Sequence, residues 1–286
     1  MRRTLYTVLA TLLTCALVGE NARSSTAWPV RPIVHVQVGA DNNFRGNPFV
    51  QPRDPALAGG GIDQTLKFGD VLSGTTQDDF LIGGLGDDVL FGRDGDDVLL
   101  GGLEHFHPRS SDRIFGHSGN DIVIWAPGDG SDFMDGGPGQ DVLILSLVGE
   151  VVEGQVVFRL SDDKQAGEVF IDPKTNLPLL EVRNAPGFCQ VIDQSSSADA
   201  AEQLAALGVQ HLVRFFLRDV ADAFERGDQT TDNGLRQTMY LRNMEVLICT
   251  SRDGGAIEVL DLTVSPPTPV PLTSLALRHR LQQMIR

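Results

Sequence analysis

The chain has 286 residues, of which 38 are acidic and 23 are basic, giving a formal net charge of −15 at pH 7. This surplus of carboxylates disfavours a nucleic-acid-binding role, because no wide basic face is available to neutralise phosphates. The length predicts one or two domains.

Residues 1–27 are typical of a secretory signal peptide. Arg2 and Arg3 come before an apolar run from Leu5 to Val18, and small residues at positions 25–27 offer a cleavage site before Trp28. The apolar run is short for a membrane span, and no later segment is apolar enough to cross a bilayer. We therefore expect a secreted protein, periplasmic or extracellular, with no transmembrane segment in the mature chain.

Residues 28–64 are rich in proline and asparagine and contain one strand-like stretch, at residues 33–38. A stacked repeat array follows, and such arrays need a cap over each exposed end. We expect this segment, or part of it, to form the N-terminal cap.

Residues 65–145 repeat a nine-residue pattern eight times. The type unit is Gly83-Gly84-Leu85-Gly86-Asp87-Asp88-Val89-Leu90-Phe91, and the stretch from Gly74 to Leu100 fits three units without a gap. Two other units need insertions, after Gly101 and near Trp125. The sixth position is always aspartate: Asp70, Asp79, Asp88, Asp97, Asp112, Asp121, Asp132 and Asp141. The eighth is always aliphatic or methionine: Leu72, Leu81, Leu90, Leu99, Ile114, Val123, Met134 and Leu143.

The composition of the unit favours a calcium site. Glycines at the first, second and fourth positions permit left-handed backbone, so six residues can make a tight turn whose carbonyls converge. The aspartate adds a carboxylate, and hard oxygen ligands of this kind suit Ca²⁺, which takes about 6–8 oxygens. The candidate metal-site residues are the eight aspartates and the turn glycines Gly83, Gly84, Gly86, Gly92, Gly95, Gly101, Gly119, Gly136, Gly137 and Gly139.

The array resembles the hemolysin-type (RTX) calcium-binding repeat, G-G-x-G-x-D-x-U-x. The resemblance implies a parallel β-roll in which two units make one coil and each Ca²⁺ bridges stacked turns on one edge. Asp70, Asp88, Asp112 and Asp132 would then line one edge, and Asp79, Asp97, Asp121 and Asp141 the other, for about six ions at most. The alternative is an unstructured acidic linker, which gives no reason for an apolar residue two positions after every aspartate.

The side chains that flank the eighth position point outward, because strand residues alternate between faces. One expected face is mixed and includes Ser73 and Arg113, whereas the other is wholly apolar: Phe80, Ile82, Val98, Leu100, Ile122, Ile124, Val142 and Ile144. A soluble monomer rarely exposes an apolar patch of this size. We expect the apolar face to be covered by a helix over residues 200–226 or a strand of its domain, or else to bind a protein or surface partner.

Residues 146–264 predict an α+β domain of unknown type. Strands are expected at residues 151–160, 168–172, 179–183, 188–193, 244–250 and 256–264, from their β-branched content and the turn residues between them. An apolar periodicity predicts the helix from Ala200 to about Arg226. The fold class is thus mainly β with α: a parallel β-roll of nonapeptide repeats followed by an α+β domain.

Residues 265–286 begin with a proline-rich stretch, expected to be an extended spacer, and end with an amphipathic helix over residues 275–285. Removal of the signal would leave two cysteines, Cys189 and Cys249. In an exported protein two cysteines more often pair than not, so we favour a disulfide over two buried thiols.

Two classes of function agree with these features. The first is an exported, non-enzymatic calcium-binding protein with a structural, adhesion or surface-association role. The second is a secreted hydrolase with an unrecognised active site in residues 146–264, stabilised by the roll. The only histidine of that region is His211 and no nucleophile–base motif is recognisable there, so the first class is preferred.

Overall fold

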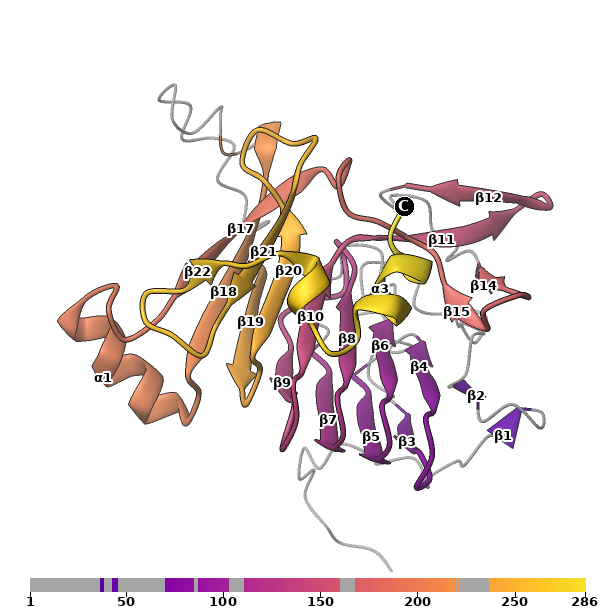
Figure 1. The fold of residues 1–286 in the computed structure, drawn as a ribbon, viewed down its shortest axis with the longest axis horizontal. Helices are drawn as coiled ribbons and strands as arrows, with labels where there is room; N and C mark the ends of the chain where they lie inside the picture. The colour runs from indigo at the N-terminus through magenta and orange to yellow at the C-terminus, as the bar shows by residue number, and fades with distance from the viewer. Residues whose placement is uncertain are drawn as a thin grey trace, which may run out of the picture.

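The structure, a computed structural model, describes residues 37–38, 43–45, 70–84, 87–102, 111–159, 168–219, 221 and 237–286. The expected signal peptide, most of the expected cap and Gly86 lie outside this part of the chain. Strands dominate the described residues, and the expected fold class is confirmed: a parallel β-roll is followed by an α+β region (Figure 1).

Two long sheets face each other in the roll. The nine-stranded sheet has the order β1 (Gln37–Val38), β2 (Asn43–Arg45), β4 (Phe80–Gly84), β6 (Val98–Gly102), β8 (Ile122–Trp125), β10 (Val142–Leu145), β20 (Val246–Thr250), β21 (Ile257–Asp261) and β22 (Thr268–Pro269). The seven-stranded sheet has the order β17 (Gly187–Ile192), β18 (His211–Leu217), β19 (Gln237–Arg242), β9 (Phe133–Asp135), β7 (Arg113–Ser118), β5 (Val89–Asp94) and β3 (Val71–Ser73).

The repeat strands alternate between these sheets, and each pairs in parallel with the strand two units away. The eighth-position side chains align across the register, as in Leu72–Leu90–Ile114–Met134, and all eight point between the sheets. Each of them is at most 1 % exposed. The core between the sheets is therefore a stack of apolar side chains, to which each repeat unit contributes its eighth-position residue.

Both sheets continue beyond the repeats. The strand β19 pairs in parallel with β9, and β20 pairs in parallel with β10, so a segment about 100 residues downstream adds another coil. Leu241 and Leu247 extend the stack of inward side chains and are fully buried. Strands from both sides of residue 145, and from both sides of residue 264, belong to one sheet. The domain boundaries expected at these two residues stay predictions.

The apolar outer face of the nine-stranded sheet is covered, as expected. Ile82, Leu100 and Ile124 are buried. Their cover is the segment around β15 (Leu177–Pro178) and β16 (Leu180–Glu181), together with the C-terminal helix α3 (Arg278–Met284). In Figure 1, α3 lies across the roll strands. Within the described residues the chain covers this face itself, and the alternative of a protein or surface partner at an apolar roll face stays a prediction.

The opposite outer face is the mixed one, and it is more open. Arg113 is exposed as expected, but Ser73 is only half-exposed and accepts a hydrogen bond of 2.9 Å from Nε of Arg93. The helix α1 (Ala198–Leu207) packs on this face and not on the apolar one, through Leu204 against the strand residue Leu212.

The predicted helix over residues 200–226 is wrong at residues 208–217; residues 218, 219 and 221 are helical, and residues 220 and 222–226 lie outside the described residues. Gly208 adopts the left-handed conformation, with φ 69°, and its N–H caps the last turn of α1. Residues 211–217 then form β18, in which Val213 and Phe215 point into the core. Short apolar runs fit helical and strand periods alike, and pairing with β17 and β19 decides between them.

The remaining strands are short. The expected strand at residues 151–160 is instead a hairpin of β11 (Leu147–Val152) and β12 (Gln155–Phe158), because Glu153 and Gly154 both have positive φ and form the turn. The strands β13 (Glu168–Val169) and β14 (Ile171–Asp172) follow.

The proline-rich stretch is extended as expected, but β22 within it pairs with β21. A 3₁₀ turn (Leu272–Ser274) leads to α3, and no helix of the described residues is long and apolar enough to span a bilayer.

Candidate calcium-binding edges

The eight aspartates of the repeats form two hydrogen-bonded columns, one on each edge of the roll. In each column, Oδ1 of one aspartate accepts a hydrogen bond from the main-chain N–H of the aspartate before it. The Asp70 column consists of Asp70, Asp88, Asp112 and Asp132. The Asp79 column consists of Asp79, Asp97, Asp121 and Asp141. These are the two edges expected from the repeat.

In the seven buried aspartates, one carboxylate oxygen has no hydrogen-bond partner. Seven of the eight side chains are at most 3 % exposed, and Asp70 is half-buried. The buried oxygens without a hydrogen bond are Oδ2 of Asp88, Asp97, Asp112, Asp121, Asp132 and Asp141, and Oδ1 of Asp79. A buried, unpaired carboxylate oxygen costs several kcal/mol, on the order of the penalty for desolvating an ion, unless a cation is near.

The first-position glycines leave room beside these oxygens. A methyl group on Gly92 would collide with Oδ2 of Asp97 and the carbonyl oxygen of Gly116. The same arrangement recurs at Gly74, Gly83, Gly101, Gly116 and Gly136, each beside the aspartate of its own unit. Each space is thus lined by a carboxylate oxygen, which is unpaired except at Gly74, where Oδ2 of Asp79 accepts hydrogen bonds from Thr75. At all of these glycines but Gly101, a main-chain carbonyl of the next stacked turn also lines the space. This all-oxygen lining fits Ca²⁺.

The other turn glycines shape the loop. Gly84, Gly95, Gly119 and Gly137 have φ between 97° and 140°, a region that other residues rarely adopt. Gly139 has ordinary φ, but a side chain there would meet the Gly119 carbonyl of the stacked turn. The turns therefore stack backbone on backbone, and their glycines are needed for conformation and for close approach.

Burial raises the pKa of the seven buried column aspartates. It raises the pKa of Asp97 and of Asp141 to about 8 and that of Asp121 to about 7. In the Asp70 column the pKa values of Asp88, Asp112 and Asp132 are also raised, again first by burial and then by neighbouring carboxylates. Without a metal these groups hold protons near neutral pH, so a bound cation has to displace those protons.

Asp129 is a candidate ligand that the sequence reasoning missed. Its carboxylate lies with those of Asp112 and Asp132, and the ligand oxygens of the three are within 4.8 Å of one another. Asp129 is fully buried, and both of its oxygens lack a hydrogen-bond partner. Its signal was visible in the insertion near Trp125, where an acidic residue stands between Gly128 and Gly130, both with positive φ. The unit that departs most from the repeat therefore holds the densest carboxylate cluster.

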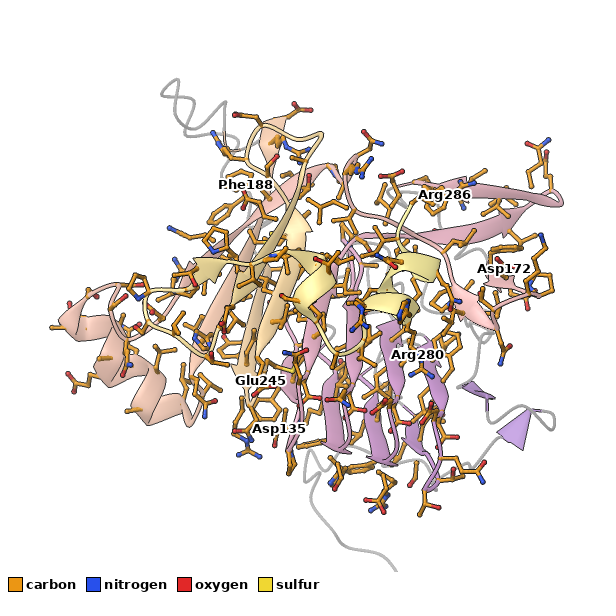
Figure 2. All side chains as sticks on the ribbon, in the orientation of Figure 1. Asp135, Asp172, Phe188, Glu245, Arg280 and Arg286 are labelled. Carbon is orange, nitrogen blue, oxygen red and sulfur yellow. The ribbon has the colours of Figure 1, made fainter. Side chains whose placement is uncertain are left out.

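A second row of side chains lies beside the Asp79 column. Asp78 and Asp96 each accept a main-chain N–H from the next stacked turn. Arg280 of the tail helix, labelled in Figure 2, donates to the Asp78 carboxylate at 3.1 Å and to the carbonyl oxygen of Asp96. The helix that covers the apolar face is thereby attached to this edge as well.

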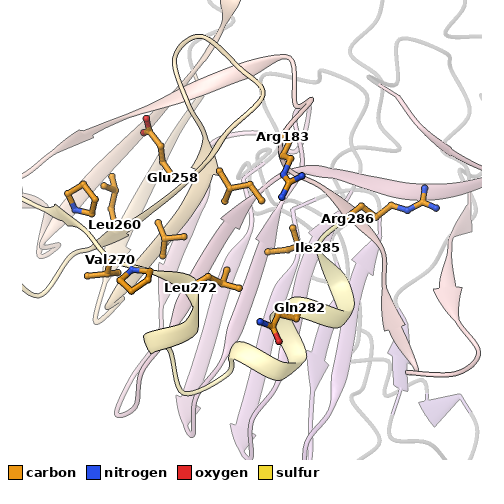
Figure 3. A pocket seen from close by; sticks show the side chains of 12 residues that line it. Arg183, Glu258, Leu260, Val270, Leu272, Gln282, Ile285 and Arg286 are labelled. Atoms are coloured by element: carbon orange, nitrogen blue, oxygen red, sulfur yellow. The ribbon is translucent and has the colours of Figure 1, made fainter.

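Two places among the described residues bear on the hydrolase alternative, a cavity and the surroundings of His211. A cavity of about 630 Å³ between β21, β22 and the tail is lined by aliphatic side chains with Arg183, Glu258 and Arg286, and contains no serine, cysteine or histidine (Figure 3). Elsewhere, burial lowers the pKa of His211, whose Nδ1 lacks a hydrogen bond. The nearby serines 195, 196 and 265 donate to Asp193.

Comparison with known families agrees with this geometry. A model of the RTX calcium-binding nonapeptide repeat matches four copies, at residues 68–104, 109–124 and 128–144. Comparison with curated proteins found no match. The columns of buried aspartates coincide with the matched residues, and such repeats bind Ca²⁺. Residues 68–144 therefore carry RTX calcium-binding nonapeptide repeats.

Proposed function

We propose that this is an exported, non-enzymatic protein whose roll folds around Ca²⁺ and supports a structural, adhesion or surface-association role. The observation that carries the proposal is the pair of columns, in which each buried aspartate keeps one carboxylate oxygen without a partner. A metal that binds only the folded columns contributes its binding free energy to folding.

Removal of calcium tests this proposal. We expect the mature chain in excess chelator to lose most of its β-sheet signal in circular dichroism, and to regain it when Ca²⁺ is added. Mg²⁺ at the same concentration should restore much less, because it requires a stricter octahedral geometry and retains its waters. A roll that is equally folded in chelator and in calcium would contradict the proposal.

A surface-association role is supported by the open face of the seven-stranded sheet. Phe91 and Phe115 stack there with ring centroids 5.2 Å apart, and Arg93 lies over the Phe91 ring. Both rings are half-exposed, unlike the apolar residues of the opposite face. Capture of partners by the native protein in calcium, compared with Phe91→Ser and with the same protein in chelator, would show whether this face is used.

Export is supported by the signal-like residues 1–27, and it bears on the two cysteines. Cys189 on β17 and Cys249 on β20 are free thiols in the structure and belong to different sheets. Burial raises the pKa of Cys189, and the neighbouring Cys249 thiol raises it further. Neighbouring thiols in an oxidising compartment pair readily, so we propose that the secreted protein carries a Cys189–Cys249 disulfide.

A further inference from the structure

The Asp79 column does not end with the last repeat. The main-chain N–H of Asp141 donates a hydrogen bond of 2.8 Å to Oε2 of Glu245, in the position that the next aspartate would take. Glu245, labelled in Figure 2, lies about 100 residues after the column and outside the matched repeats. A glutamate from non-repeat sequence thus occupies the fifth place of the column.

The main chain around Glu245 also follows the repeat. The N–H of Val246 donates to the carbonyl of Asp141 at 3.0 Å, as the N–H of Val142 does to the carbonyl of Asp121 at 2.9 Å. Val246, Leu247 and Ile248 pair in register with residues 142–144 of β10. The segment therefore has the hydrogen bonds and the register of a repeat unit without the glycine-rich sequence.

The space beside Asp141 has the same lining as the spaces between repeats. Oδ2 of Asp141 is fully buried and has no partner. A methyl group on Gly136 would collide with this oxygen and with the carbonyl oxygen of Asn243. At Gly116 the corresponding pair is Oδ2 of Asp121 and the carbonyl of Gly136. Asn243 has φ 50° and so takes the left-handed conformation elsewhere given to glycine.

We infer that Asp141, the Asn243 carbonyl and Glu245 form an additional Ca²⁺ site, which closes the Asp79 edge and fastens β20 to the roll. This inference rests on the proposed calcium-dependent folding. Asp141 supplies an unpaired buried oxygen beside the Asn243 carbonyl, and Glu245 accepts the hydrogen bond that a fifth aspartate of the column would accept. The expected three sites of this edge become four, and the fourth joins segments that are far apart in the sequence.

Calcium stoichiometry of the full mature chain tests the site. We expect titration calorimetry with Ca²⁺ to give one ion fewer for Glu245→Gln than for the native protein, because the amide keeps the hydrogen bond to Asp141 but loses the charge. Glu258→Gln removes the same charge from an exposed position on β21 and should leave the stoichiometry unchanged. An unchanged stoichiometry in Glu245→Gln would overturn the inference, whereas a native protein that binds no Ca²⁺ would overturn the proposed function itself.

Hydrogen exchange of the native protein gives a test that does not depend on a variant. The amides of residues 246–250 should gain protection as Ca²⁺ is added, together with those of β10. If β20 is protected to the same degree without calcium while β6, β8 and β10 become protected only with it, the additional site does not exist. Glu245→Gln should lower the calcium-dependent protection of β20 more than that of β6.

Discussion

The repeats and the region after residue 145 both need positive charge beside main-chain oxygens, but they obtain it differently. In the repeats, buried carboxylates and carbonyls converge on spaces that no side chain fills. In the later region, the guanidinium of Arg218 donates to the carbonyl oxygens of Ala185, Gly187 and Arg252. Under the proposed function, the first region takes its cation from solution, whereas the second carries its own.

The proposed disulfide should have the largest effect on the region after residue 145. It would close a loop of about 60 residues between the two sheets, which the loop-entropy account values at about 4 kcal/mol of unfolding free energy. Reduction of the secreted protein should lower its stability by about that amount in denaturant titrations at saturating calcium. Mass spectrometry that finds both thiols free to alkylation in natively secreted protein would rule the link out.

Arg218→Met should cost about 3 kcal/mol of unfolding free energy, because several buried carbonyls lose their donor at about 1–3 kcal/mol each. Thermal unfolding in saturating calcium measures the loss. Calcium stoichiometry should not change, since no column residue contacts Arg218. Arg214→Met, on the same strand, is the matched control and should lie close to the native protein. If Arg218→Met bound one calcium ion fewer than the native protein, the later region would also depend on calcium, and the contrast between the two regions would be wrong.

Asp97→Asn, in contrast to Arg218→Met, should weaken calcium binding by the repeats. The amide oxygen keeps the column hydrogen bond, but the charge beside the space is lost, so we expect calcium affinity to fall at least about tenfold, or about 1.4 kcal/mol. Calorimetric titration measures this, with Asp94→Asn, an exposed neighbour, as the control. Equal calcium affinity in the two variants would show that the columns do not bind the ion.

The pH dependence should separate the metal-free and calcium-bound forms of the repeats. The pKa of Asp97 is about 8 and that of Asp121 about 7 in the folded chain, against 3.8 for the ordinary aspartate. Between the unfolded pKa of 3.8 and these raised folded values, the folded form holds more protons than the unfolded form. The metal-free roll therefore loses stability as pH rises from about 4 to 8.

Calcium replaces those protons, so its affinity should rise with pH over the same range. Titrations at pH 6 and pH 8 measure the change in affinity. Titrations at pH 7 in buffers of different ionisation enthalpy measure the protons released. An affinity that is independent of pH, with no proton release, would contradict the raised pKa values.

Much of the roll was predictable because its information is local and periodic. The buried eighth positions follow from the alternation of strand side chains in a repeat of nine residues. The two aspartate columns and the apolar face follow from the resemblance to RTX repeats, which implies that alternate units stack side by side. The turn glycines were predictable for the same reason, since a tight turn of six residues needs left-handed backbone at fixed places. A structure adds distances to this part of the fold but changes none of its pairings.

The rest depended on contacts that have no fixed interval in the sequence. Gly208 ends α1, yet only pairing with β17 and β19 makes residues 211–217 a strand. The tail helix covers the apolar face because Leu281 and Met284 pack against it, and no spacing in the sequence predicts this contact. Glu245 becomes a candidate ligand only because the folded chain brings it to the Asp79 column, and the fold also gathers Asp129 with Asp112 and Asp132. The sequence by itself determined the repeating unit and its chemistry, because both are set within nine residues. The tertiary structure decided how the edges close, because closure is a matter of which distant side chains fill the remaining space.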